Sequence, residues 1–352
     1  MALEAGGKRT GTGLALLLMG IVSAMLLLYF GRAVFEPLVF ALFIIALTAP
    51  FMHKLRPVVG KGLAMLLTVA LTLAVLFVFF SIVFWGISQV AGWVMANLGQ
   101  FDAAYREVNL WLAKQDMPLD VLLPASFDPR WVVGPIMSLV EQARLISGFA
   151  LLVFVFAVLG LTELDGMARR MAKIEADRPN LKVTEVVKDV SAKFGLYMKV
   201  RLVVSLIDTL VCYIFFRIIG LEEPLAWAIL VGTMNFIPFI GPLLVTVAIA
   251  LFTAAQFGSL WMVVLAAGGT SIINFVLGSY IEPLMAGNAL SMSAVLVLFS
   301  VFFWAIFWGI PGAFIGVQIM IVILAVLRRM PSAAWLAELF SGDSAEKAVS
   351  QG

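Results

Sequence analysis

Two clusters of glycine and proline decide how the chain folds: Asn235-Phe236-Ile237-Pro238-Phe239-Ile240-Gly241-Pro242 and Trp308-Gly309-Ile310-Pro311-Gly312. They interrupt residues 224–327, an apolar stretch in which Glu282 is the only charged residue. Such a stretch is expected in lipid, where a crossing helix needs about 20 apolar residues and each unsatisfied backbone group costs several kcal/mol. We therefore expect the two breaks to be buried in protein or to line a cavity.

The composition assigns the chain to the all-α polytopic membrane proteins. Of the 352 residues, 63% are hydrophobic and 12% are charged, whereas a soluble domain has about 25% charged residues. The mean hydropathy is +1.08. Cys212 is the sole cysteine, which excludes an internal disulfide and a multi-cysteine metal site. The expected partner is the lipid bilayer, and the formal net charge of +2 indicates membrane topology and no nucleic-acid binding.

Charge-free runs predict about six full transmembrane helices and two broken hairpins, which give about eight apparent spans. We expect this order along the chain: transmembrane helices one to three (1–97), an extracytoplasmic amphipathic segment (98–130), helix four (131–162), cytoplasmic basic amphipathic helices (163–201), the transport core with both hairpins (202–329), and a cytoplasmic C-terminal tail (330–352).

Lysine and arginine set the expected orientation. The second span, residues 34–51, is followed by a predicted loop with Lys54, Arg56 and Lys61, and residues 169–201 carry nine bases against four acids. Basic residues near span ends favour the cytoplasm. Both chain ends are therefore expected to be cytoplasmic, with helix four ending near Leu161 and helix five beginning at Leu202.

Each arm beside a break is shorter than a membrane crossing. The arms of the first break, residues 225–236 and 243–257, reach about 20 Å at 1.5 Å per residue, whereas the hydrocarbon core is about 30 Å thick. If both breaks are re-entrant hairpins, they enter from opposite sides as an inverted repeat, which points to a transport site. Two full crossings at each break remain the alternative, because they leave the C-terminus on the same side.

The breaks themselves are the first candidate site. Proline lacks the donor N–H and glycine allows tight turns, so hairpin tips can present half-helix ends and carbonyl groups to a polar solute. The alternative is a simple kink that aids packing. The residues concerned are Asn235, Pro238, Gly241, Pro242, Gly309, Pro311 and Gly312.

A polar stripe on the helix before the second break is the next candidate. Ser271, Asn274, Gly278 and Glu282 follow at spacings of 3, 4 and 4, which places them on one helical face. An acid within the membrane suggests a path for a substrate or a coupling ion. Polar contacts between helices, with Glu282 near cytoplasmic water, are the alternative.

Helix five carries a second polar stripe with Arg201, Ser205, Asp208 and Cys212. Asp208 lies about two turns inside the span, where an unpaired carboxylate is costly. Arg201, on the same face, is a candidate structural partner, and a neighbouring helix could supply another. Proton or cation coupling through Asp208 is the functional alternative.

Catalytic chemistry finds no support in the sequence. His53 is the only histidine, no HExxH sequence or P-loop occurs, and no serine has a base at a recognisable spacing. We expect no enzyme activity, no metal and no cofactor, and the coupling of transport to protons or sodium is left open.

At these residues the chain resembles the autoinducer-2 exporter family of bacterial permeases. The similarity covers about the last 150 residues and is carried by three segments: 227–242, Asn274 with Ile281-Glu282-Pro283-Leu284-Met285-Ala286-Gly287, and 298–312. It implies a multi-spanning inner-membrane permease, with some relatives exporting autoinducer-2 and others similar to sodium/proton antiporters. Two residues depart from the family pattern: Gln318, where a proline is common, and Asp208, where an uncharged residue is expected.

The sequence thus favours a secondary transporter that moves a small polar solute by alternating access. A neutral, hydroxyl-rich solute suits Asn235, Asn274 and exposed backbone better than an anion does. The alternatives are a cation/proton antiporter in which Asp208 or Glu282 exchanges a proton for a cation, and a non-transporting membrane scaffold. A homo-oligomer is left open.

Overall fold

A computed structural model describes residues 16, 19–20, 22–113, 127–178, 183–286, 292–329 and 334–340. The ends of the chain, including most of the expected C-terminal tail, and the start of the first predicted span lie outside these residues. In the described part all regular structure is helical, and six helices are long and apolar enough to cross a membrane. The predicted all-α membrane architecture is confirmed at this level.

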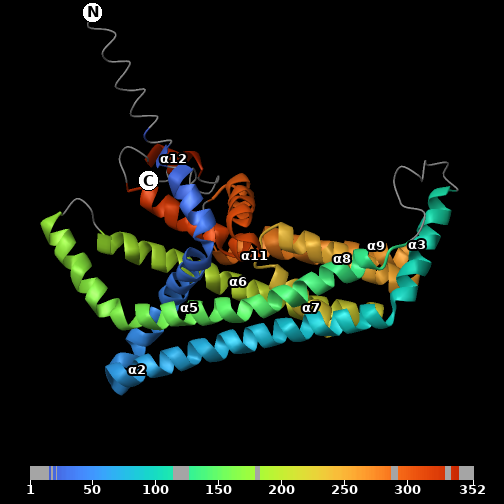
Figure 1. The fold of residues 1–352 in the computed structure, drawn as a ribbon, viewed down its shortest axis with the longest axis horizontal. Helices are drawn as coiled ribbons and strands as arrows, with labels where there is room; N and C mark the ends of the chain where they lie inside the picture. Colours follow the sequence, from blue (N-terminus) through green and yellow to red (C-terminus); the bar gives the residue numbers. More distant parts are fainter. Residues whose placement is uncertain are drawn as a thin grey trace, which may run out of the picture.

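Residues 22–30 are helical, and the labelled elements that follow are α2 Arg32–Ala96, α3 Leu98–Ala113, α5 Arg130–Asp177, α6 Val183–Ile219, α7 Pro224–Met234, α8 Ile240–Phe257, α9 Leu260–Val276, the π-helix η2 Leu277–Ile281, α10 Glu282–Ala286, α11 Ala294–Leu327 and α12 Ala334–Leu339. Several long helices, among them the second part of α2 and much of α5 and α6, run along one long axis, and the first part of α2 crosses them (Figure 1).

The predicted basic loop after the second span is wrong. α2 stays helical through this region and reverses at Gly60, whose φ of 79° and ψ of 166° suit glycine. Two bases of the region, Arg56 and Lys61, both form ion pairs of 2.7 Å with Asp165 on α5. A single residue therefore makes the turn, and α5 holds it in place.

The predicted helix ends at Leu161 and Leu202 are also wrong. α5 continues to Asp177, and α6 begins at Val183. The cytoplasmic amphipathic helices expected between these positions are continuous with the spans. Charged residues end the part of a helix that suits lipid, but residues 162–177 and 183–201 contain no proline that would end the helix itself.

The first break folds as a helical hairpin. α7 ends at Met234, residues 235–239 turn, and α8 runs back from Ile240. A β-carbon on Gly241 would overlap the carbonyl group of Met234, so the turn needs glycine here. With 11 residues, α7 reaches only about 16 Å, well short of a membrane crossing. The expectation of two short arms fails for α8, which has 18 residues and is one of the six helices long enough to cross.

The second break folds in the same way with a tighter turn. Gly309, at φ 63° and ψ −141°, reverses the chain inside α11. The two arms then lie backbone to backbone, because a β-carbon on Gly316 would stand 2.7 Å from the carbonyl oxygen of Ser300. A β-carbon on Gly312 would likewise overlap the carbonyl group of Trp304.

The bases of the two hairpins are held at opposite ends of α6. At the end of α8, the Gln256 side chain donates to the Gly220 carbonyl and accepts from the Glu222 amide. After α11, Arg329 forms an ion pair of 2.8 Å with Glu185 in the first turn of α6. Figure 1 shows α7 to α9 extending towards α3, with α11 on the side of α12.

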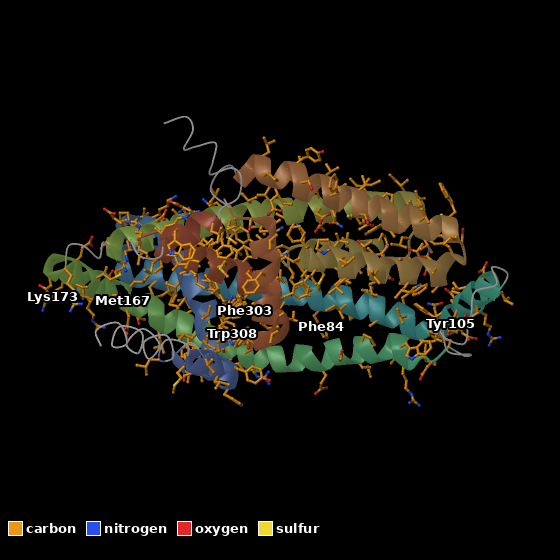
Figure 2. All side chains as sticks on the ribbon, turned by 90° about the horizontal axis from the view of Figure 1, so that it is seen from above. Phe84, Tyr105, Met167, Lys173, Phe303 and Trp308 are labelled. Carbon is orange, nitrogen blue, oxygen red and sulfur yellow. The ribbon has the colours of Figure 1, made fainter. Side chains whose placement is uncertain are left out.

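The tip of the first hairpin packs against the two arms of the second hairpin, where Ile237 shares a cluster with Val301 and Ala313. Phe236 of the first tip stacks on Phe314 of α11, with ring centroids 5.4 Å apart. Figure 2 shows Phe303 and Trp308 of α11 near the middle of the long axis, between Lys173 at one end and Tyr105 at the other.

Close packing between the arms of α11 predicts that Gly316→Ala destabilises the protein. The added methyl group meets backbone, which cannot rotate away, so we expect a loss of about 1–3 kcal/mol in the free energy of unfolding. Chemical unfolding in detergent measures it. Gly268→Ala on α9, where a β-carbon meets nothing within 4 Å, is the matched control, and equal effects of the two substitutions would contradict the observed packing.

Candidate functional site

A buried polar face of α6 runs between the two hairpins. Arg201, Ser205, Asp208 and Cys212, the stripe recognised in the sequence, are all buried, and Tyr197 continues it one turn earlier. Polar side chains inside a membrane protein face protein or water and avoid lipid. We refer to these five residues as the α6 polar face.

Arg201 joins two elements through charge. Its Nη1 donates to Oε2 of Glu282 at 3.0 Å, and its Nε donates to the Tyr197 hydroxyl at 3.2 Å. The suggested pair between Arg201 and Asp208 is therefore wrong. Seven residues separate these two along the helix, about 10 Å of rise, whereas Glu282 approaches directly from the neighbouring segment.

Asp208 is more deeply buried than Glu282 and has different neighbours. Its side chain is 1% exposed, and its Oδ1 accepts a hydrogen bond from the Cys212 thiol at 3.4 Å. Asp208 and Glu282, which the sequence offers as equal candidates for exchanging a proton and a cation, therefore differ in their partners. Glu282 is paired with a base, and Asp208 is bonded to a thiol.

Asn235 connects the first hairpin tip to the α6 polar face. Its Nδ2 donates to the Ser205 hydroxyl at 3.3 Å, and both residues are buried. The approach is close, because a β-carbon on Gly232 would stand 2.8 Å from the Ser205 carbonyl oxygen. The neighbouring Pro238 and Pro242 shape the turn, in which the Pro238 carbonyl accepts from the Ile240 amide at 2.7 Å.

The polar stripe predicted on α9 and the residues after it contains two half-buried and two exposed residues. Asn274 and Glu282 are half-buried, whereas Ser271 and Gly278 are exposed. Nδ2 of Asn274 is buried and has no protein hydrogen-bond partner. The π-helix η2 lies between Asn274 and Glu282, and its wider turn shifts the register by one residue. This shift helps to bring Glu282 to Arg201.

The residues around the turn of the second break pack closely against neighbouring segments. Trp308, just before Gly309, donates from Nε1 to the Leu28 carbonyl at 3.1 Å. Gly312 lets the second arm pass Trp304. Pro311 follows the reversal in the first turn of the returning arm, a position that proline tolerates.

Two buried polar residues near the hairpins were missed as site residues. Tyr197, which reads in the sequence as part of an apolar stripe, packs in one cluster with Ile237 of the first tip and with residues of α11. Gln318, noted only as a family departure, is 2% exposed, and its Nε2 lies 3.9 Å from Sδ of Met198. The spacing of four residues between Tyr197 and Arg201, which places both on one face of the helix, is the sequence signal that could have indicated this contact.

Comparisons with known proteins identify a transporter family. The family model described as "AI-2E family transporter" matches residues 14–332. A putative transport protein of Borreliella burgdorferi is 29% identical over 148 residues, 42% of this chain and 40% of that protein. The AI-2 transport protein TqsA of Escherichia coli is 23% identical over 325 residues, 89% of this chain and 90% of TqsA. A putative transport protein of Haemophilus influenzae is 23% identical over 282 residues, 75% of this chain and 79% of that protein.

The buried ion pair predicts that Glu282→Gln lowers stability. The change leaves the buried guanidinium of Arg201 without its counter-charge, which costs about 3–5 kcal/mol in comparable pairs. Arg201→Gln added to Glu282→Gln should recover part of the loss, and chemical unfolding of the two single variants and the double variant measures the coupling. The exposed pair of Asp102 and Arg106 is the control, with an expected coupling below about 1 kcal/mol. Additive effects at Arg201 and Glu282 would show that the pair carries no coupling.

Proposed function

Because the chain belongs to the AI-2E family of transporters, we propose that it is a secondary transporter that moves a small polar solute across a bacterial inner membrane. Family membership confirms the resemblance seen in the sequence, and it assigns the protein to a family of transporters and not of enzymes. The relative TqsA is named as an AI-2 transport protein. Autoinducer-2 is therefore the first solute to test.

The observation that supports this proposal most is the meeting of two helical hairpins beside buried polar groups. Their bases are tied to opposite ends of α6, and the tip of the first hairpin packs on an arm of the second through Phe236 and Phe314. Broken helices with opposed entry near the midplane are the usual architecture of a transport site. The solute path in this proposal passes between the tips, along the α6 polar face.

The chemistry of this face favours a neutral solute rich in hydroxyl groups. Glu282 already neutralises Arg201, so that guanidinium is a poor site for an anion. Ser205, Asn235 and Asn274 offer hydroxyl and amide groups that both donate and accept hydrogen bonds. Hydrogen bonding without net charge is the recognition mode that such groups provide.

Alternating access follows if the hairpins act as two gates. In this proposal both are re-entrant, the first opening to the outside and the second to the cytoplasm, with both chain ends cytoplasmic. α7, with 11 residues, supports re-entry of the first hairpin, because it is too short to cross about 30 Å of hydrocarbon. Each hairpin can then open its own side while the other stays packed on α6.

The proposal predicts saturable autoinducer-2 flux in liposomes that contain the purified protein. Asn235→Leu should reduce the flux roughly tenfold or more, because the Ser205 hydroxyl loses its partner and the path loses an amide. The exposed Ser88 on α2, which bonds to its own helix, provides Ser88→Ala as a control with unchanged flux. Flux no greater than in protein-free liposomes would reject this solute, and a panel of other small polyols would then test the wider class.

The proposed topology predicts opposite labelling of the two hairpin bases. In a Cys212→Ala background, a cysteine replacing Gln256 should react with an impermeant thiol reagent added outside, and one replacing Arg329 only with reagent added inside. Cysteines at Pro238 and Pro311 should react slowly from either side, because the tips lie at the midplane. Full reactivity of the two bases from one side would rule out the inverted arrangement.

A further inference from the structure

Asp208 is a buried acid of the α6 polar face to which the recognition of the solute gives no role. It lies within the apolar helix Thr184–Ile219, one of the six candidate membrane spans, and its side chain is 1% exposed. An ionised carboxylate in such a place is costly unless a base, a cation or water compensates it.

The contacts of Asp208 do not supply a compensating charge. Its Oδ1 accepts from the Cys212 thiol at 3.4 Å, and a thiol is a weak donor. The base on the same face of α6, Arg201, is bonded to Glu282 at 3.0 Å and to Tyr197. Glu282 is therefore the neutralised acid of the site, and Asp208 is the one whose charge would stand alone.

The helices packed around α6 add no charge near Asp208. α7, α8, α9, α11 and residues 62–96 of α2 contain no Asp, Glu, Lys, Arg or His, and the same holds for residues 145–162 of α5. Asp165, near the far end of α5, is paired with Arg56 and Lys61. Tyr280 of η2 is exposed.

A second incompletely satisfied group lies at the level of Asp208. α6 runs antiparallel to the segment formed by α9, η2 and α10, with Arg201 bonded to Glu282 of α10 at one contact and the ring of Phe215 packed against Gly269 of α9 at another. This register places Asn274 within about one helical turn of Asp208. Nδ2 of Asn274 is buried without a protein partner, so a second polar group at about this level of the helices lacks a hydrogen bond.

We propose that Asp208 is a proton-binding site of this transporter. In the arrangement described here the carboxyl group carries its proton, and it releases the proton to water when the site opens to the other side. The step moves one proton between bulk water and the carboxylate and changes no other bond. Its role in driving the solute rests on the proposed function, but the protonation itself does not.

A sodium ion fits this place less well. Hard cations take several oxygen ligands, whereas the hydrogen-bond partner of the Asp208 carboxylate is sulfur. The Ser205 hydroxyl already accepts from Asn235, and the Thr209 hydroxyl donates to the Ser205 carbonyl. In the described ranges, no group of three or more His, Cys, Asp or Glu side chains could hold a metal.

Infrared spectroscopy of the purified protein in lipid tests the protonation directly. At neutral pH we expect a C=O stretching band of a protonated carboxylic acid, with a component that disappears in Asp208→Asn. The control is Glu36→Gln, which removes a half-buried carboxyl group on α2 and must leave that component in place. Spectra of Asp208→Asn that match the unmodified protein would overturn the proposal.

Cys212→Ser gives a second readout without removing the acid. A hydroxyl donates a stronger hydrogen bond than a thiol, so the Asp208 component should shift to lower frequency; an unshifted component would contradict the assignment. Loss of the component on adding sodium at constant pH would show a cation site and also overturn it.

Transport measurements then separate this inference from the proposed function. Dependence of autoinducer-2 flux on an imposed pH gradient should be lost in Asp208→Asn. If the infrared component is present but no solute flux is measured, the proposed function is rejected and the proton site stands. If a pH gradient drives solute flux but the infrared component of Asp208 is absent, the proton site is rejected and the proposed transport function stands.

Discussion

The whole arrangement depends on one constraint: inside a membrane, a broken helix must find hydrogen-bond partners for its backbone within the protein. The hairpin turns meet part of this need themselves, as at Pro238 and Ile240. The rest of the protection comes from burial, since Phe236 and Ile237 at the first tip are buried among other helices. The first break is covered by α6 and by the arms of α11, and the second by Leu28 and the start of α2.

This constraint also explains why α6 carries so much of the chemistry. It is the element to which both hairpin bases are tied, and its buried face meets the first tip at Asn235 and the α9 region at Glu282. A helix that holds parts of both hairpins must offer polar partners along most of its length. The α6 polar face, from Tyr197 to Cys212, does so.

The sequence predicted the breaks well, since glycine and proline act locally: Gly309 and the turn before Gly241 reverse the chain as expected. It predicted the pairing of charges poorly. Arg201 and Glu282 are 81 positions apart, and no periodicity connects them. The π-helix at Leu277–Ile281 has no recognisable local signal either. Tyr197 could not be recognised as a polar contact, because an aromatic ring at helical spacing fits an apolar stripe whether or not its hydroxyl is used.

The stacked rings of Phe236 and Phe314 have a consequence for how this molecule can change over evolutionary time. One ring belongs to each hairpin, so neither of these two surfaces can be reshaped without refitting the other. Neighbouring residues in contact do not contribute additively to stability. Substitutions at one of the two rings would therefore be accompanied by substitutions at the other, and the two hairpins would diverge in step.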